Sequence, residues 1–240
     1  MAQNLSKLEQ ILGYQFKDIA LLERALTHRS WAFEKLPTGS DEEIRDLQNE
    51  SFEFVGDSVV GLAVAEQLFV HNPKASEGDL TLMKHHLVST ESLAKCAKKL
   101  GLSKYLRIGR GEEKTDGRKK QAIQANTLEA VIAAVFFDGG YIAVRSFVGR
   151  IFAEELRTAT PRSSLDFKTL LQETLQAQKL TAPNYRVVKT DGLPHERIFH
   201  VEATWENGKV KGKGTSIKAA EMMAANAALK KLAKNQNKKR

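Results

Sequence analysis

The sequence has little of what marks membrane or disulfide-bonded proteins. Its 240 residues include a single cysteine, Cys96, so no disulfide can form within the chain. The longest apolar stretches, residues 59–65 and 130–137, have seven and eight residues, and a membrane-spanning helix needs roughly 20. The N-terminus, MAQNLSKLEQ, has no charged segment followed by an apolar leader. These absences predict a cytoplasmic protein without a membrane partner.

The patterns of several catalytic classes are absent as well. The glycines at residues 109–111 follow no strand pattern, so they do not form a phosphate-binding loop, and the nucleophile motif GxSxG does not occur. The histidines form no cluster with zinc-ligand spacing, and the adjacent His85 and His86 diverge on a helix. Each histidine is therefore expected at the surface or at the edge of a core.

Positive charge is concentrated in the last third of the chain. Residues 1–160 contain 21 Lys+Arg and 22 Asp+Glu, whereas residues 161–240 contain 16 and 7, so the net charge of +8 divides into −1 and +9. A lysine-rich terminus explains part of this excess as a solvated tail. It does not explain the four lysines around a glycine turn, which are Lys209, Lys211, Lys213 and Lys218. The sequence predicts that the C-terminal part binds a polyanion.

The periodicity of apolar residues predicts two domains. Over residues 1–157 apolar residues recur at intervals of three and four, which indicates an all-α domain of about seven helices or more. Residues 158–165 contain Pro161 and small polar residues and are expected to form a linker. Residues 166–235 indicate a helix, three antiparallel strands and a second helix, which is an α+β module.

Acidic residues are expected to share one face of a buried helix in the run NESFEFVGDSVV. At 100° per residue, Glu50, Glu53 and Asp57 fall within an arc of about 60°. A second apolar helix opens with NTLEAVIAAVFF, where Asn126 and Glu129 are three residues apart and point the same way. Carboxylate and amide oxygens are ligands for hard cations such as Mg²⁺. The pattern favours a metal site, and the alternative is that these acids cap helices or pair with Arg and Lys.

Several motifs follow one another in a fixed order. The run at residues 49–60 is similar to NERLEFLGDSVL, the signature of bacterial ribonuclease III, and departs from it at Ser51, Phe52 and Val55. ALTHRS, EGDL, TLEA and DGG occupy the places they have in that family. The resemblance covers nearly the whole chain. It implies an all-α ribonuclease III catalytic domain followed by an α-β-β-β-α double-stranded RNA-binding domain.

The resemblance also implies an activity and its residues. The family hydrolyses double-stranded RNA as a homodimer with Mg²⁺, for which Mn²⁺ can substitute. The products carry 5′-phosphate and 3′-hydroxyl ends with a short 3′ overhang, and the substrates include ribosomal RNA precursors and other structured transcripts. Phe54 matches a residue that protrudes from one subunit into the other. The positions that match catalytic and metal-binding residues are Glu53, Asp57, Asn126 and Glu129, with Glu50 and Glu77 contributing to catalysis around them.

One departure falls inside this acidic cluster. The family has Asp where this chain has Asn126, and a neutral amide oxygen is a poorer ligand for Mg²⁺ than a carboxylate. The alternative function is therefore a double-stranded RNA-binding protein that cleaves weakly or not at all. Because Glu53, Asp57 and Glu129 are retained, the enzyme is favoured. A DNA-binding regulator is disfavoured, since no helix-turn-helix is recognisable.

Two RNA-contacting surfaces are expected from the first part of the C-terminal module. Gln172, Glu173 and Gln176 share one face of its first helix and would meet 2′-hydroxyls in the minor groove. His195, in a loop similar to the family's GPxH turn but with Leu193 inserted, would reach the next minor groove. Such contacts recognise the shape of an A-form duplex and not its base sequence.

A third RNA-contacting surface is expected where the last helix begins. Lys213, Thr215, Ser216 and Lys218 surround this helix N-terminus, whose free amides and dipole attract phosphate. Ile217 replaces a lysine that is common in the family at that position. Binding through phosphates should be tolerant of sequence and sensitive to salt.

Overall fold

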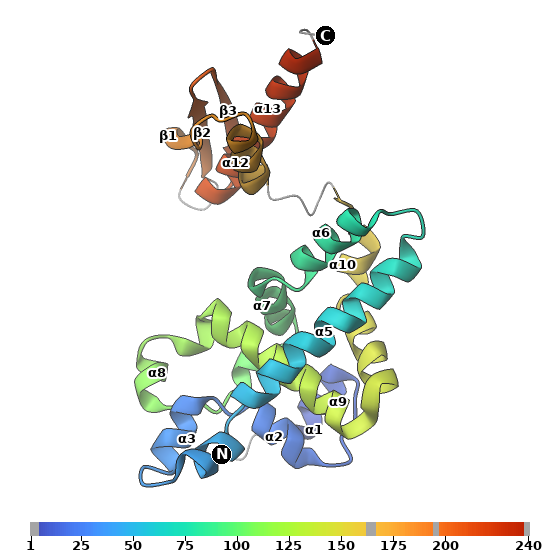
Figure 1. The fold of residues 1–240 in the computed structure, drawn as a ribbon. Helices are drawn as coiled ribbons and strands as arrows, with labels where there is room; N and C mark the ends of the chain where they lie inside the picture. Colours follow the sequence, from blue (N-terminus) through green and yellow to red (C-terminus); the bar gives the residue numbers. More distant parts are fainter. Residues whose placement is uncertain (1–4, 162–166, 194–196, 238–240) are drawn as a thin grey trace. The chain divides into compact units, whose positions relative to one another are not determined.

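The computed structural model describes residues 5–161, 167–193 and 197–237 (Figure 1). The chain divides into two compact units, Met1–Ser164 and Leu165–Arg240. The described part of the first unit is helical, and that of the second contains a three-stranded sheet and two helices. The expected fold class, an all-α domain followed by an α-β-β-β-α module, is confirmed. Of the expected linker, residues 158–161 are described, while residues 162–166 lie outside the described part.

The N-terminal unit contains ten α-helices and two short 3-10 helices within its described residues. They are α1 (Leu5–Leu12), α2 (Ile19–Ala25), α3 (Arg29–Lys35), α4 (Asp41–Leu47), α5 (Glu50–His71), α6 (Glu77–Leu87), α7 (Thr90–Lys99), η1 (Leu102–Lys104), α8 (Arg110–Lys114), η2 (Gly117–Lys119), α9 (Gln121–Ile151) and α10 (Ala153–Thr158).

The long helices α5 and α9 lie side by side at the centre of this unit (Figure 1). The two backbones come very close at Gly56, where an added Cβ would lie 1.9 Å from the carbonyl oxygen of Glu129. Only glycine therefore permits this spacing between the two backbones. The approach occurs at the level of the acidic residues, so packing of the core also brings the two acidic helix faces together. Helix α9 bends at Gly140, whose φ of 73° lies in the left-handed region.

By length and apolar composition, α5 and α9 are also the two described helices that could span a membrane. In the folded unit their apolar side chains form the core, and Val60, Val64, Val131 and Val135 are fully buried. Burying such a side chain contributes about 1.5–3 kcal/mol. The central position of both helices in the folded unit therefore accounts for their apolar character.

The C-terminal unit contains one antiparallel sheet in the order β1-β2-β3 (Figure 1). Its elements are α12 (Phe167–Ala177), β1 (Asn184–Asp191), β2 (Ile198–Trp205), β3 (Gly208–Gly214) and α13 (Ile217–Asn237).

Both helices of this unit pack on one face of the sheet. Val201, Ala203 and Trp205 alternate along β2 and are buried against residues such as Leu171 of α12 and Ala224 of α13. Trp205 therefore belongs to the core of this unit. The opposite face of the sheet carries no helix among the described residues of this unit.

Candidate active site

Side chains of α5 and α9 line a pocket of about 610 Å³ in the N-terminal unit. Its lining residues are Glu50, Glu53, Phe54, Asp57, Thr90, Ala125, Asn126 and Glu129. The structure thus brings together five of the six acidic and amide residues for which the sequence predicted a catalytic or metal-binding role. The sixth, Glu77, is not among the lining residues. It lies in the first turn of α6, where it accepts a hydrogen bond of 3.1 Å from the Thr81 hydroxyl.

Helix geometry explains why these side chains converge. Glu53 and Asp57 are four residues apart on α5, and Asn126 and Glu129 are three apart on α9, so each pair points to one side of its helix. The Asn126 amide of α9 lies near enough to the Glu53 carboxylate of α5 to favour its ionised form, so the two helix faces meet here. Thr90, at the first residue of α7, also lines the pocket, and no pattern in the sequence indicated it.

Burial and mutual repulsion raise the pKa values of two carboxyls in the pocket. The pKa of Glu129 rises to about 7, first because it is buried and then because of the charges on Asp57 and Glu53. Burial also raises the pKa of Glu53, and the charges of Glu50 and Asp57 add to this, while the neighbouring Asn126 amide opposes it. Ionising these carboxyls together is costly, so a bound cation would stabilise the charged pocket.

The ligand chemistry of the pocket suits a hard divalent cation. Glu53, Asp57 and Glu129 offer carboxylate oxygens and Asn126 offers an amide oxygen, the donor types that Mg²⁺ prefers. Among the residues that the structure describes, no group of three or more His, Cys, Asp or Glu side chains is close enough to hold a metal ion. The donor types and the mutual repulsion of the carboxyls suit a cation, and these four side chains would have to draw closer together to hold it.

Glu50, at the edge of the pocket, has hydrogen-bond partners on both carboxylate oxygens. Arg29 Nη1 donates to Oε1 at 2.9 Å, and Gln48 Nε2 donates to Oε2 at 3.1 Å. The backbone N–H of Glu50 donates in return to Gln48 Oε1. Gln48 is buried, so this contact holds the start of α5 as well as the carboxylate. The sequence pattern gave no sign of Gln48, whereas Arg29 lies in the motif ALTHRS.

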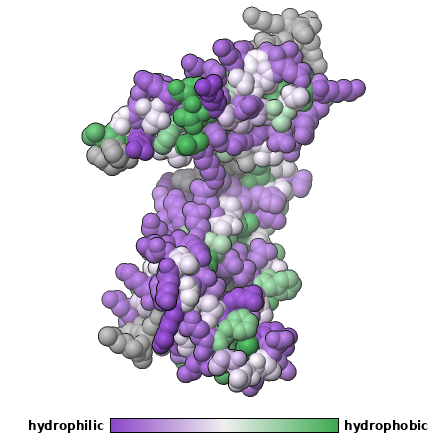
Figure 2. All heavy atoms as spheres, turned by 90° about the vertical axis from the view of Figure 1, so that its left-hand side faces the viewer, coloured by the Kyte–Doolittle hydropathy of each residue, from purple (hydrophilic) through white to green (hydrophobic). Residues whose placement is uncertain are grey.

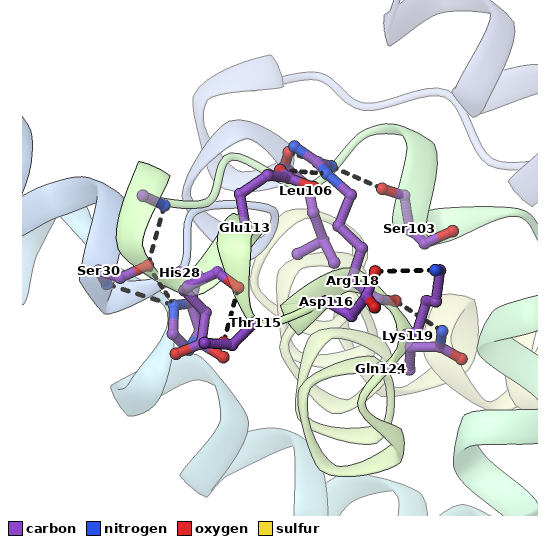
Figure 3. Close-up of polar contacts among 12 residues, drawn as sticks. His28, Ser30, Ser103, Leu106, Glu113, Thr115, Asp116, Arg118, Lys119 and Gln124 are labelled. Carbon is purple, nitrogen blue, oxygen red and sulfur yellow. Dashed lines mark hydrogen bonds and ion pairs between the residues drawn. The ribbon is translucent and has the colours of Figure 1, made fainter.

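The turn that carries Arg29 is itself fixed by hydrogen bonds (Figure 3). His28 Nδ1 accepts from the Ser30 backbone N–H at 3.3 Å and lies 2.8 Å from Ser30 Oγ, so His28 caps α3. Ser30 Oγ in turn accepts from the backbone N–H of Gly109 at 2.9 Å. The pKa of His28 is lowered, chiefly by burial, which favours the neutral ring that this cap requires. Arg29 therefore begins α3 from a fixed position.

Comparison with known proteins decides the family. The sequence model of Ribonuclease-III-like proteins matches residues 18–156, and that of the double-stranded RNA binding motif matches residues 167–232. The chain belongs to the ribonuclease III family. Over 235 residues it is 42% identical to the protein named Ribonuclease 3 of Magnetococcus marinus, covering 97% of this chain and 95% of that relative.

Solved structures of the family agree with this assignment. The nuclease domain of ribonuclease III from Campylobacter jejuni matches with a TM-score of 0.56 and 36% sequence identity, over 63% of this chain and 95% of that one. A second structure of that domain, described as flexible in the region involved in dimer formation, gives the same TM-score and identity over 63% and 98%. With a nuclease domain joined to a double-stranded RNA binding motif, this ribonuclease III is a double-stranded RNA-specific endoribonuclease.

The RNA-binding module of this ribonuclease III places two of its predicted surfaces next to each other. Gln172, Glu173 and Gln176 are exposed on α12, and Gln172 lines one hollow together with Lys218 of α13. At the start of α13, Ser216 Oγ accepts a hydrogen bond of 3.1 Å from the Ala219 N–H. Thr215 is exposed beside it, and His195 lies outside the described residues. These positions stay predicted RNA contacts.

Lys213 does not extend toward α13 with the others. Its neighbours Gly212 and Gly214 face that helix so closely that an added Cβ would lie 2.2 Å from Ala224 N and 2.4 Å from Ala220 N respectively. Since side chains alternate along a strand, Lys213 extends from the opposite face of the sheet. Lys218, on α13 itself, is the lysine on the helix-bearing side.

Proposed function

We propose that this ribonuclease III hydrolyses phosphodiester bonds in both strands of an RNA duplex with Mg²⁺, leaving 5′-phosphate and 3′-hydroxyl ends with a short 3′ overhang. The pocket formed by Glu53, Asp57, Asn126 and Glu129 is the observation that supports this most. When bound there, a divalent cation would lower the pKa of water and neutralise charge on the phosphate. Mn²⁺ offers similar coordination chemistry and should substitute.

The residues around the pocket have different roles in this reaction. Glu53, Asp57 and Glu129 supply the negative charge that retains a cation, and binding it would displace the proton that Glu129 holds near neutral pH. Glu50, held by Arg29 and Gln48, keeps a fixed carboxylate at the pocket edge. Among the described residues that line the pocket there is no Cys, His or Lys. Attack by water therefore suits the pocket better than attack by one of these side chains.

We propose a homodimer as the active form, with Phe54 in the interface. Phe54 and Ile142 are each 77% exposed, and Leu62 and Phe69 are 57% and 67% exposed. Large apolar side chains in such numbers on a surface indicate an interface, and the Campylobacter jejuni nuclease domain has a region involved in dimer formation. A two-fold dimer would offer one pocket to each strand of a duplex.

Ribosomal RNA precursors and other structured transcripts are the proposed natural substrates, and the cytoplasm is the proposed location. The matched RNA-binding motif recognises duplex shape more than base sequence, which suits varied substrates. Sequencing the RNA ends in cells that lack the protein tests the substrates, since precursor ends should accumulate. Cell fractionation tests the location.

The decisive experiment incubates an end-labelled RNA duplex with the full chain, with and without Mg²⁺. Cleavage should require the cation and should disappear in Asp57→Asn. Ligation of adaptors that require a 5′-phosphate identifies the product ends. Binding of the RNA without any cleavage at millimolar Mg²⁺ would refute the proposed nuclease activity. It would support the alternative, an RNA-binding protein in which Asn126 prevents cleavage. Sedimentation of Phe54→Ser beside the unsubstituted chain tests the dimer.

A further inference from the structure

The face of the C-terminal sheet that carries no described helix is strongly basic. Strand register places eleven side chains on this outer face. They are Asn184, Arg186, Lys189 and Asp191 of β1, Ile198, His200, Glu202 and Thr204 of β2, and Lys209, Lys211 and Lys213 of β3. Five are Lys or Arg and two are carboxylates, so the net charge of the face is +3 with His200 neutral.

Glycines on the other side of β3 fix the direction of its lysines. Gly212 and Gly214 lie against α13, and neither position leaves room for a Cβ. Lys209, Lys211 and Lys213 alternate with the residues that face α13 and therefore lie in one row on the outer face, all exposed. Alternate residues of a strand are about 6.6 Å apart, so the row spans about 13 Å.

Most of this positive charge has no carboxylate partner. Lys189 pairs with Asp191 at 2.8 Å, and His200 pairs with the other oxygen of Asp191 at 2.9 Å. Within the described part of the chain, no ion pair involves Arg186 or the three lysines of β3. Figure 2, seen from the side on which the strands lie in Figure 1, shows a mainly hydrophilic surface on this unit, interrupted by apolar patches at its centre and at one end. These cations are available to an external anion.

We propose that this outer face, defined by Arg186, Lys209, Lys211 and Lys213, binds the phosphate backbone of a second segment of duplex RNA. The first segment would occupy the helix-bearing side, where Gln172 and Lys218 lie. The two sides of the sheet point in opposite directions, so one module would hold two duplex segments at once. Binding of the second segment does not require the proposed nuclease activity. It requires only that the C-terminal module binds duplex RNA.

The composition of the face selects duplex backbone over single-stranded RNA. Single strands are held largely by stacking bases on aromatic rings, and the described outer face has no Phe, Tyr or Trp, while its one imidazole is engaged with Asp191. A flat row of cations instead matches a row of phosphates, which supply affinity without base readout.

Lysine protection tests the proposal directly. The full chain is mixed in EDTA with increasing amounts of a duplex RNA of about 16 base pairs, the length one such module spans, then treated with an acetylating reagent and examined by mass spectrometry. Lys218 should be protected first, and Lys209 and Lys211 should follow at higher RNA concentration. Because EDTA prevents metal-dependent cleavage, the result does not depend on the nuclease activity. Reactivity of Lys209 and Lys211 that stays unchanged at RNA concentrations far above those that fully protect Lys218 would overturn the proposal.

A charge variant supplies the second readout. Arg186→Gln/Lys209→Gln/Lys211→Gln should abolish the second binding phase or lower the slope of its log affinity against log salt by about 2.7, since each neutralised phosphate contributes about 0.9 to that slope. The first phase should stay unchanged.

The matched control is Lys74→Gln/Lys98→Gln/Lys230→Gln, which removes three exposed cations elsewhere and should retain both phases. An equal weakening of the second phase in this control would show that only the total charge matters and would refute the assignment to the outer face. Protection of Lys209 and Lys211 by anionic vesicles or polyglutamate, but not by RNA, would assign the face to another partner and also refute the proposal.

Discussion

The Asn126 amide on α9 and the Glu53 carboxylate on α5 line the same pocket, and their polar interaction favours the ionised form of that carboxyl. This contact gives Asn126 a function in the metal-free protein that an ionised Asp could not have. A carboxylate at position 126 would face Glu53 and Glu129 and repel both. Stability without the cation and affinity for the cation should therefore oppose each other at this position.

Asn126→Asp should bind Mg²⁺ about tenfold more tightly, because ligand charge sets the affinity of oxygen sites for divalent cations. It should also lower the free energy of unfolding in EDTA by about 2 kcal/mol, because the favourable polar interaction of the amide with the ionised Glu53 carboxyl is replaced by repulsion. Mg²⁺ titrations of cleavage and thermal melts measure the two effects. Asn126→Ala, which removes the ligand oxygen, should cleave more slowly than either. Equal Mg²⁺ requirements for Asn and Asp would show that the amide is not a ligand.

Gly56→Ala should destabilise the protein by about 3 kcal/mol, because its Cβ would meet the Glu129 carbonyl oxygen at 1.9 Å and force α5 and α9 apart. The matched control is Gly61→Ala on the same helix, where nothing lies within 4 Å of the added Cβ. That change should leave stability equal or raise it by about 0.5–1 kcal/mol, the helix preference of Ala over Gly. Urea unfolding compares the two, and similar losses at both positions would contradict the close approach.

Much of the pocket could be predicted from the sequence because helix periodicity is a local property. The arc of Glu53 and Asp57 and the pair of Asn126 and Glu129 follow from residue spacing alone. The structure adds that Gly56 brings the two faces together. Of the two partners of Glu50, Gln48 could not be predicted, since its side chain must reach forward from the end of α4 to the first residue of α5.

Other features were visible in the sequence and could have been interpreted. Ser40 and Glu43 form a capping box at the start of α4, in a segment whose role was not predicted. The alternation of Lys209, Lys211 and Lys213 with other residues already places these lysines on one face of a strand. The sequence could not show that this face carries no helix, because that depends on which side of the sheet α12 and α13 cover.

Without metal, the protein should lose stability as pH rises from about 4.5 to about 7. The pKa of Glu129 is raised from 4.5 to about 7 in the folded state, chiefly by burial. The folded state therefore holds more protons than the unfolded state in this window, and stability falls as pH rises through it. Glu53, whose pKa is also raised, acts in the same direction. Thermal melts in EDTA across this range measure the effect.

Two variants and the cation show whether Glu129 is the source of this pH dependence. Glu129→Gln cannot ionise and should flatten the profile. The control Glu42→Gln, an exposed position on α4, should leave it unchanged. Mg²⁺ should restore stability most at the higher pH, where the carboxylates that would bind it are ionised. A profile that stays steep in Glu129→Gln would assign the pH dependence to other groups.

Gln48→Leu should lower the free energy of unfolding by about 2 kcal/mol, because it removes two hydrogen bonds and leaves the Glu50 N–H without its partner. Cleavage should slow several-fold while the Mg²⁺ requirement stays the same, since Glu53, Asp57 and Glu129 are untouched. Gln48→Glu keeps an acceptor for the N–H but sets a second carboxylate against Glu50, so it should recover part of the stability and none of the rate. If Gln48→Leu instead cleaves at the original rate, then holding Glu50 in place contributes only to the stability of α5.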